Sequence, residues 1–319
     1  MLMFRHWLAV LALVSALPTA LQAQPAGRAE ALHPKAAEVA PDTWMVQGLS
    51  ALGSPANRNF ISNAGFVVTS CGVAVIDALG SPELARELRA EIARVTPLPV
   101  THVIVTHYHA DHIYGLQVFK DAGATIVAHR QALQYLNSDN ARQRLAASRE
   151  DLFPWVDEST RLVPADLWID GPTSLRVCDT VLELRPVGPS HTAEDVVVWL
   201  PQRQVLFAGD LVFRGRIPFV GQADSARWID ALDTLLSFDA RVVVPGHGPA
   251  STQARADLEL TRDYLQYLRL TMGEAARNLD PFEEAYARTD WSRFERLPLF
   301  GAANRINAYN TYLLMEQAK

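Results

Sequence analysis

The sequence has little cysteine, no excess of basic residues and only one long apolar run, and each shortage excludes a class of protein. Two cysteines among 319 residues, Cys71 and Cys178, are too few for a disulfide framework. Whether they pair stays open, because separation along the chain says nothing about distance in space. Lys plus Arg is 29 and Asp plus Glu is 35, a formal net charge of −6. The chain therefore lacks the basic surface typical of nucleic-acid-binding proteins.

The single long apolar run lies at the N-terminus and has the order of a secretory signal peptide. Residues 1–6 carry one arginine and no acid, residues 7–17 are apolar, and small residues follow up to Ala23. A membrane anchor or a buried helix is the alternative, but a membrane-spanning helix needs about 20 apolar residues. We therefore predict a signal peptide over residues 1–23 and an exported, periplasmic protein without a stable membrane anchor after cleavage.

The rest of the chain has the composition of a globular α/β protein, with 49% hydrophobic and 20% charged residues. Residues 24–42 are rich in Ala and Pro and predict a flexible leader, and residues 43–319 predict one domain. Two successive halves, each with strands before a helix, predict two packed sheets with helices outside. Predicted strands are 43–50, 65–70, 72–79, 101–107, 125–129, 174–178, 181–187, 195–200, 204–210 and 241–247. Predicted helices are 81–95, 115–122 and 226–236, together with a helical C-terminal part over 254–319.

One short segment concentrates groups that bind metal ions. His107, His109, Asp111 and His112 fall within six residues at the end of the predicted strand 101–107. Three imidazoles and a carboxylate are costly to bury without a cation, whereas a divalent metal uses the neutral imidazole nitrogens and the carboxylate as ligands. A solvated polar loop is the alternative, but four such residues at fixed positions favour a metal site.

Three later residues repeat this pattern of a polar group beside a strand end. His191 precedes the strand predicted at 195–200, and Asp210 and His247 each end a predicted strand. Each alone is more typical of a turn or a cap, but after the first motif they predict further ligands. Nitrogen and oxygen ligands without thiolate suit Zn²⁺ and also tolerate Fe or Mn. The sequence contains neither a CxxC motif nor a Ser-His-Asp arrangement that would indicate another chemistry.

Together these segments resemble the metallo-β-lactamase-fold hydrolases. The resemblance covers about residues 43–248 and rests on four motifs, which are His107-x-His109-x-Asp111-His112, His191 in GPSHT, Asp210 in AGD and His247 in PGHG. It implies an α/β fold of four layers, an αββα sandwich, with the site at one edge between the sheets. The helical C-terminal part would be an extension of that sandwich.

The resemblance also implies a role for each motif residue. His107, His109 and His191 would hold one metal ion, Asp111, His112 and His247 would hold a second, and Asp210 would bridge the two. Two zinc ions per chain are expected, with a shared hydroxide attacking a carbonyl or related centre. Asp111 would be the catalytic residue that orients this nucleophile. Asp77 also occupies a family position, where it would order the loop rather than bind metal.

The resemblance indicates the type of reaction, but it does not identify the substrate. Three segments, THYHADHIYG, GPSHTAEDVVVWLP and FAGDLVFRGRIPFVGQADSARWIDALDTL, look like exported zinc metallohydrolases associated with quinoprotein or sulfur-oxidation systems. We expect a small-molecule substrate such as a thioester, a lactone or a related ester or amide. A metallo-β-lactamase is an alternative, although those enzymes carry Cys or Ser where this chain has Asp210. A mononuclear-iron persulfide dioxygenase is a further alternative, since it uses the same scaffold with one iron.

Other polar residues near the motifs have two interpretations. Arg214 and Arg216 follow Asp210 closely, and they would either meet an anionic substrate group or lie in a solvated loop. Tyr108 and Tyr114 would either donate to an oxyanion or, as we favour, pack in the core. Core packing is also expected of the tail residues Tyr264, Leu265, Tyr267 and Leu268.

Overall fold

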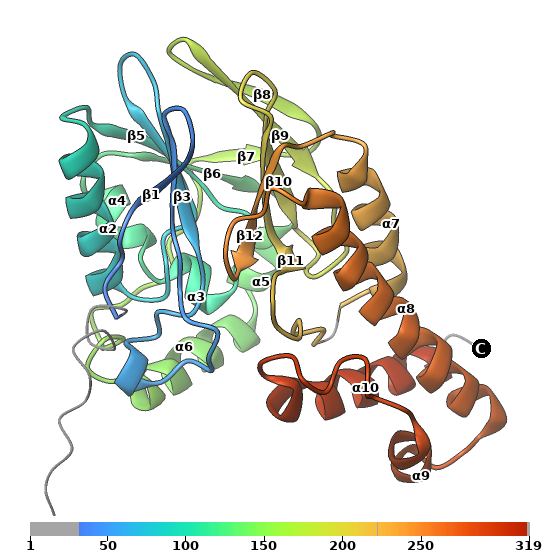
Figure 1. Ribbon diagram of the computed structural model, residues 1–319. Helices are drawn as coiled ribbons and strands as arrows, with labels where there is room; N and C mark the ends of the chain where they lie inside the picture. The colour runs from blue at the N-terminus through green and yellow to red at the C-terminus, as the bar shows by residue number, and fades with distance from the viewer. Residues whose placement is uncertain (1–31, 222, 318–319) are drawn as a thin grey trace, which may run out of the picture.

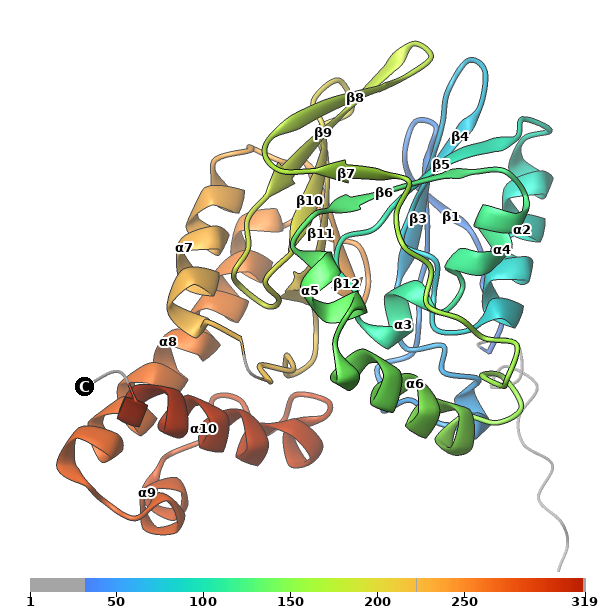
Figure 2. The ribbon, with the colours of Figure 1, turned by 180° about the vertical axis from the view of Figure 1, so that it is seen from behind.

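The computed structural model describes residues 32–317 except residue 222. The predicted signal peptide, residues 1–23, lies outside the described residues. In the described part, two β-sheets face one another and helices cover the outer face of each (Figures 1 and 2). This is the four-layer αββα sandwich that the resemblance implied.

The first sheet has seven strands in the order β1-β2-β3-β4-β5-β6-β7, which is also their order along the chain. Neighbours from β1 to β4 are antiparallel, and neighbours from β4 to β7 are parallel. The strands are β1 Ala37–Ala40, β2 Thr43–Val46, β3 Ala64–Val68, β4 Val73–Ile76, β5 Val100–Ile104, β6 Thr125–His129 and β7 Leu167–Ile169. Because parallel strands require crossovers, helices separate β4, β5 and β6 along the chain.

The second sheet has five strands in the order β12-β11-β10-β9-β8. Only the pair β11 and β12 is parallel, and the crossover between them contains a helix. The strands are β8 Thr173–Val177, β9 Thr180–Pro186, β10 Val196–Leu200, β11 Val205–Phe213 and β12 Val242–His247. As a result, the C-terminal ends of β11 and β12 lie side by side at one end of the sandwich.

The helices divide between the two outer layers and the C-terminal part. The first sheet is accompanied by α2 Pro82–Val95, α3 Ala110–Ile113, α4 Leu116–Asp121, α5 Ala132–Leu136 and α6 Asp139–Asp151, with the single turn η1 Pro55–Asn57 in the loop after β2. The second sheet and the C-terminal part contain α7 Ser225–Leu236, α8 Ala254–Asn278, α9 Phe282–Arg288 and α10 Phe300–Gln317. Figure 1 shows α10 alongside the C-terminal half of α8, with α9 nearby and both below the two sheets in this view.

Alternation along the strands explains why the two sheets pack together. On β4, Val75 points into the core beneath the helices, while Ala74 and Ile76 point between the sheets. On β10, Val197 faces the helices that cover the second sheet, and Val198 faces the first sheet. Strands with apolar residues on both faces must be covered on both faces, and four layers result.

The prediction of a flexible leader over residues 24–42 is wrong for its last part. Residues 37–40 form β1, which pairs with β2 in an antiparallel register, Ala37 opposite Met45. The strand β7 was also not predicted. Both strands are short and lie at the edges of the first sheet, so neither has the long alternating pattern by which strands are found in a sequence.

The C-terminal part packs through the tail residues that the helical pattern predicted as core. Tyr264, Leu265 and Leu268 of α8 are buried, and the Tyr267 hydroxyl donates to the backbone carbonyl of Asp290. Asn307 of α10 donates to the backbone carbonyl of Pro218, so α10 holds the loop that follows β11. Among the described residues, no helix combines the length and apolar character that crossing a membrane requires.

Cys71 and Cys178, whose pairing the sequence left open, form a disulfide. Their Cα atoms are 5.9 Å apart across a sequence separation of 107 residues. Cys71 lies in the turn between β3 and β4, and Cys178 lies in the turn between β8 and β9. The bond therefore joins one sheet to the other.

Replacing both cysteines by serine should lower the free energy of unfolding by about 2–4 kcal/mol, because the unfolded chain then loses a long covalent loop. Chemical denaturation of the wild type and of Cys71→Ser/Cys178→Ser, without reductant, measures this difference. The wild type with reductant serves as the control and should approach the double variant. Equal denaturation midpoints for oxidised wild type and variant would contradict the prediction.

Candidate metal centre

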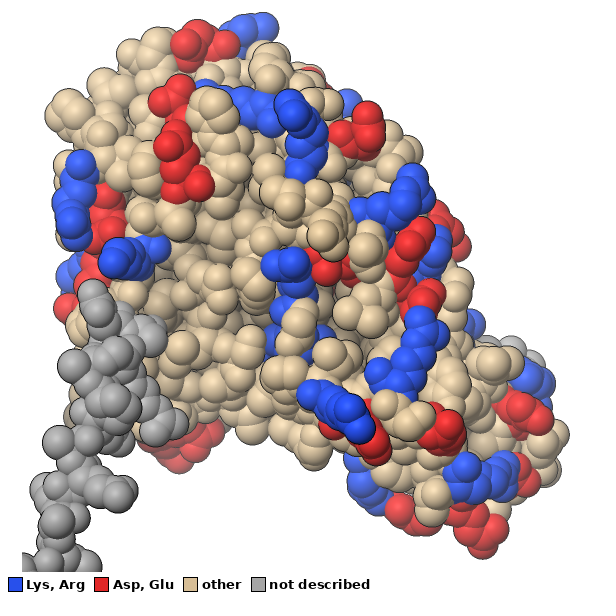
Figure 3. Space-filling model, viewed as in Figure 1, with Lys and Arg blue, Asp and Glu red and all other residues tan. Residues whose placement is uncertain are grey.

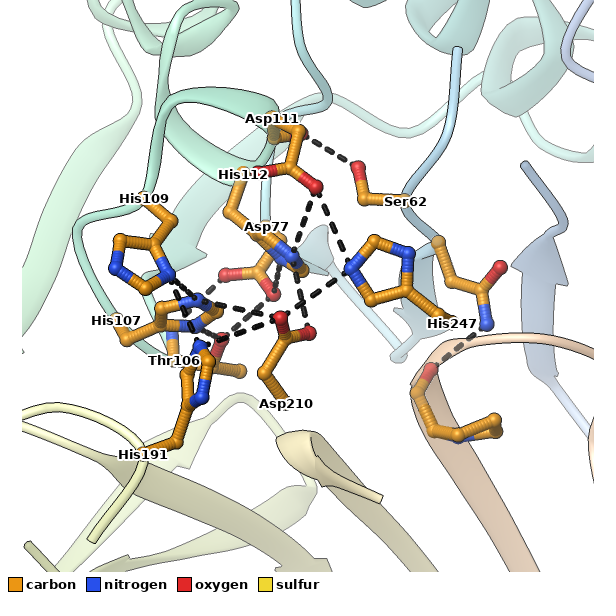
Figure 4. Close-up of polar contacts among 12 residues, drawn as sticks. Ser62, Asp77, Thr106, His107, His109, Asp111, His112, His191, Asp210 and His247 are labelled. Atoms are coloured by element: carbon orange, nitrogen blue, oxygen red, sulfur yellow. Dashed lines mark hydrogen bonds and ion pairs between the residues drawn. The ribbon is translucent and has the colours of Figure 1, made fainter. Parts of the chain in front are cut away.

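All seven residues predicted as ligands lie together at one end of the sandwich (Figure 4). They form two groups, and within each group the ligand atoms lie within 4.8 Å of one another. The first group is His107, His109, His191 and Asp210, and the second is Asp111, His112 and His247. Figure 4 shows Asp210 between the three histidines of the first group on one side and His247 of the second group on the other.

The first group presents three imidazole nitrogens at nearly one point. His109 Nδ1 lies 3.1 Å from His107 Nε2 and 3.0 Å from His191 Nε2. His191 reaches this point from the loop between β9 and β10, so both sheets contribute to the group. Its ring packs edge-on against Trp228, with centroids 5.1 Å apart, which orients the imidazole from behind.

Nitrogen atoms of the second group lie close to the carboxylate oxygens of Asp210. Asp210 Oδ1 lies 3.2 Å from His112 Nε2, and Asp210 Oδ2 lies 3.2 Å from His247 Nε2. The same Oδ2 is 3.4 Å from His191 Nε2 and 3.8 Å from His107 Nε2 of the first group. Asp111 Oδ2 lies 3.4 Å from His247 Nε2. The carboxylate of Asp210 thus faces both groups.

Strand ends and one helix turn position these side chains. The predicted strand 101–107 ends already at Ile104, and His107 lies in the loop that follows β5. Asp111 and His112 lie in the first turn of α3, where His109 is the N-cap residue. Asp210 lies within β11, which runs on to Phe213, and His247 ends the neighbouring β12. A loop held by two rigid sheets can present side chains in a fixed arrangement.

Gly246 makes room for the central carboxylate. A Cβ atom at this position would clash with Asp210 Oδ1 and with the backbone of Gly209 and Asp210. β11 and β12 therefore approach closely where Asp210 lies, which explains the glycine before His247 in the PGH motif.

Asp77 accepts hydrogen bonds that orient the loop, as the resemblance implied. Its Oδ1 accepts from the backbone N–H of Thr106, and its Oδ2 accepts from the Thr106 hydroxyl and from His112 Nδ1, at 2.8 to 2.9 Å. The amide of Thr106 therefore bonds to this side chain, and the strand ends early. With Nδ1 of His112 donating to Asp77, its Nε2 offers a lone pair to the site.

Two other histidines are oriented through the ring nitrogen that faces away from the site. His107 Nδ1 lies 3.0 Å from the hydroxyl of Thr106, which itself donates to Asp77. His247 Nδ1 lies 2.7 Å from the backbone carbonyl of Ile61. Such partners hold an imidazole with its other nitrogen toward a metal.

Burial keeps the imidazoles of the first group neutral. It lowers the pKa of His107 well below the ordinary value, and the neighbouring His112 adds to this effect. Burial also lowers the pKa of His109, and together with His109 it lowers the pKa of His191 to about 3. These rings are neutral at pH 7, and the neutral form is the one that binds metal ions.

The charges around Asp210 and His112 favour a cation. Burial alone would raise the pKa of Asp210, but His247, His112 and His107 hold it well below its usual range. For His112, burial would lower the pKa, but Asp210, Asp111 and Asp77 together raise it well above the ordinary value. Three carboxylates around one imidazole therefore stabilise positive charge at this point.

Two buried atoms without hydrogen-bond partners among the described residues show that a metal ion fits. His112 Nε2 and Asp210 Oδ1 face each other at 3.2 Å, yet neither makes a hydrogen bond of acceptable geometry. An imidazole nitrogen and a carboxylate oxygen in this arrangement are two buried polar atoms without hydrogen bonds, which is costly. A cation bound to both atoms removes that cost, and nitrogen and oxygen donors suit Zn²⁺, Fe or Mn.

The other tyrosines and arginines noted in the sequence make the following contacts. Tyr108 is buried and donates to the backbone carbonyl of Val163, and Tyr114 donates to the Ser148 hydroxyl, so both pack in the core. Arg214 pairs with Asp257, with Nε 2.8 Å from Oδ2. Arg216 lies in no solvated loop, because only 1% of its surface is exposed.

Sequence reasoning missed the residues that join the first sheet to the end of β12. Asn63 donates from Nδ2 to the backbone carbonyls of Pro245 at 2.7 Å and Gly248 at 2.8 Å. Ser62 donates to the backbone carbonyl of Asp111, and buried Glu194 accepts from the N–H of Tyr108. A Ser-Asn pair in a loop has no distinctive sequence signal, so these contacts were found only in the structure.

Charged side chains of both signs are scattered over one face of the molecule without forming one continuous patch (Figure 3). Figure 3 shows Lys and Arg interspersed with Asp and Glu over the C-terminal helices, whereas the middle of this face is largely uncharged. On the visible face of the described residues, no extended surface of a single sign is present.

Comparison with known proteins identifies relatives of this chain. A family model described as the Metallo-beta-lactamase superfamily matches residues 57–247. A metallo-beta-lactamase type 2 of Bacillus sp. (strain 170) is 31% identical over 198 residues, which is 60% of this chain and 69% of that protein. A linear primary-alkylsulfatase of Pseudomonas sp. (strain ATCC 19151) is 26% identical over 234 residues, which is 62% of this chain but only 44% of that protein.

Solved structures show the same fold. A metallo-beta-lactamase from Pontibacter korlensis superposes with a TM-score of 0.58 and 26% identity, covering 73% of this chain and 99% of that one. The sec-alkylsulfatase Pisa1 from Pseudomonas sp. superposes with a TM-score of 0.68 and 19% identity, covering 88% of this chain and 50% of that one. At this identity the second likeness concerns the fold alone, and it extends over more of the chain.

The Asp77→Asn variant should bind metal about 10–100-fold more weakly, because the amide no longer supplies the negative charge that His112 Nδ1 meets. The backbone at residue 77 has a φ of 60°, which asparagine tolerates, so folding should be preserved. Metal retention against increasing chelator concentration measures the change. Asp233→Asn, at an exposed ion pair with Arg262, is the control. Equal retention by Asp77→Asn and wild type would show that Asp77 acts on the backbone only.

Proposed function

Since this chain belongs to the metallo-β-lactamase superfamily, we propose that it is an exported hydrolase with a dinuclear zinc centre that acts on a carbonyl-type small molecule. The superfamily membership makes it a hydrolase with a His/Asp site suited to metal ions. The number and identity of the metals, the substrate class and the export are the proposed part.

The observation that carries the proposal is the position of Asp210 between two groups of ligand atoms. His107, His109 and His191 would hold one ion, and Asp111, His112 and His247 would hold the second. Asp210 would contact both ions, since its two oxygens face nitrogens of both groups. When bound, the two ions supply a water that is acidic near neutral pH and polarise the oxygen of the substrate.

Asp111 is the residue of the chain best placed to orient the attacking water. Its side chain is 17% exposed, whereas the side chain of Asp210 is 5% exposed, so Asp111 lies on the open side of the site. One of its oxygens, Oδ2, lies close to His247 Nε2 at 3.4 Å. The carboxylate is ionised at pH 7, because His112 and His247 lower its pKa against the effect of burial. It can therefore accept a hydrogen bond from water and take up its proton.

Thioesters, lactones and related esters or amides are the substrates we propose first. A β-lactam is the second candidate, favoured by the relatives that are metallo-beta-lactamases. Two similar proteins are alkylsulfatases, so sulfate esters belong in the same test. Turnover of a panel of these substrate classes by metal-loaded protein decides among them. Hydrolysis of β-lactams alone would replace the first proposal with the second.

Export is proposed from the charge, apolar and small-residue order of residues 1–23. The disulfide between Cys71 and Cys178 supports this, because disulfides persist in oxidising compartments. N-terminal sequencing of protein recovered from the periplasm or the medium should find a chain that begins at Gln24. A mature chain that begins at Met1 would contradict cleavage.

Asp210→Ala and Asp210→Ser should each bind the second ion far more weakly, because the carboxylate that offsets the repulsion between two dications is gone. Elemental analysis of the wild type should approach two zinc ions per chain, and of the variants at most one. Hydrolysis should fall by at least about 10–100-fold, the effect of losing even an outer partner of a ligand. Asp233→Ser, on the exposed side of α7, is the matched control and should behave as wild type.

Two results would contradict this account. An Asp210→Ser protein that keeps two tightly bound ions and full activity would make Asp210 a supporting residue and favour the β-lactamase alternative. A wild-type protein that holds one iron and no second metal would favour the persulfide dioxygenase alternative.

A further inference from the structure

Arg216 is a buried cation that has no carboxylate partner among the described residues. Only 1% of its surface is exposed. The other buried arginine, Arg58, pairs with Glu87 at 2.5 Å, whereas Arg216 lies within 4.0 Å of no carboxylate oxygen of the described residues. Burying an unpaired charge is costly. The loop after β11 therefore holds this guanidinium at a cost in stability.

The guanidinium lies directly behind His247. Its Nη1 is 3.2 Å from His247 Nδ1, its Nε is 3.4 Å from the backbone carbonyl of Ile217, and its Nη2 has no partner among the described residues. The rings of Phe213 and Phe219 lie 5.5 and 5.3 Å from its central carbon. Phe213 also stacks on His247, with ring centroids 4.9 Å apart. These aromatic contacts hold the cation in place.

Nδ1 of His247 cannot serve both of its neighbours at once. It either donates its proton to the Ile61 carbonyl at 2.7 Å or accepts a proton from Arg216 Nη1 at 3.2 Å. A neutral imidazole that binds metal through Nε2 carries its proton on Nδ1. The carbonyl of Ile61 can only accept and is the nearer neighbour, so Nδ1 carries the proton and donates to Ile61, and Arg216 Nη1 finds no acceptor on the ring.

We propose that Arg216 is a positioning residue that weakens metal binding at Asp111, His112 and His247, so that this group fills after the first. The inference rests on the proposed dinuclear centre. The physical reason is charge, since the ion must approach a fixed positive charge in a buried site.

Among the described residues, no arginine or lysine side chain is hydrogen-bonded to an imidazole of the first group. His107 is oriented by the Thr106 hydroxyl and His191 by the ring of Trp228. Among the hydrogen bonds of the described residues, no arginine or lysine nitrogen contacts His107, His109 or His191, whereas Arg216 contacts His247. Arg144 lowers the pKa of His109 through its charge but makes no hydrogen bond to that ring, so the two groups differ in the direct contact between a buried cation and an imidazole.

Stepwise Zn²⁺ dissociation constants, measured by titration of metal-free full-length protein against a competing chelator, test the inference without any substrate. Arg216→Met removes the charge and every donor while keeping a long side chain. The second dissociation constant should tighten at least about tenfold in this variant, with the first changed less than threefold. Arg216→Lys keeps the charge and should stay close to wild type. Arg214→Gln is the neighbouring control, because Arg214 pairs with Asp257 instead.

A second dissociation constant that is unchanged or weaker in a folded Arg216→Met protein would overturn the inference. If neither wild type nor Arg216→Met takes up a second ion at millimolar Zn²⁺, the dinuclear proposal itself fails. Two ions bound with the same constants in both proteins would leave that proposal standing and refute only the role of Arg216.

Discussion

The carboxylate of Asp210 is buried beside four imidazoles, with its oxygens 3.2 to 3.8 Å from nitrogens of His107, His112, His191 and His247. A buried ionised carboxylate costs several kcal/mol unless it is paired, so the neighbourhood of this group is tightly constrained. Gly246 has no side chain because a Cβ would clash with Asp210. Asp77 accepts hydrogen bonds from both Thr106 and His112, which turns Nε2 of His112 toward Asp210. Most of the polar residues around the site have positions that follow from this one charge.

The sandwich supplies the rigidity that this arrangement needs. The strand β5 and the helix α3 bring four ligands from the first sheet, while β11, β12 and the loop before β10 bring three from the second. Neither sheet could build both groups alone. The two sheets are held in register near the site by Asn63, which bonds to Pro245 and Gly248. At the opposite end, the disulfide between Cys71 and Cys178 joins the turns of the two sheets. The two sheets are therefore joined both near the site and at the opposite end of the sandwich.

The sequence alone predicted the layers, most of the strands and all seven residues that meet at the site. It could do so because strand ends followed by histidine or aspartate are local patterns, and the resemblance to the superfamily ordered them. The end of β5 was misplaced, because the amide of Thr106 bonds to Asp77, a residue 29 positions earlier. The edge strand β1 was mistaken for a flexible leader, since four residues show too little alternation. The disulfide, the burial of Arg216 and the role of Asn63 depend on contacts between distant segments, and no local pattern predicts them.

In the proposed dinuclear centre, Asp210 lies between two metal ions. Crystals of the protein grown with Zn²⁺ and measured at the zinc absorption edge test this claim directly, because anomalous scattering locates each ion independently of the model of the chain. We predict two anomalous peaks, one beside His107, His109 and His191 and one beside Asp111, His112 and His247, each within bonding distance of a different Asp210 oxygen or of a shared one. A single peak, or two peaks that Asp210 does not contact, would contradict the account.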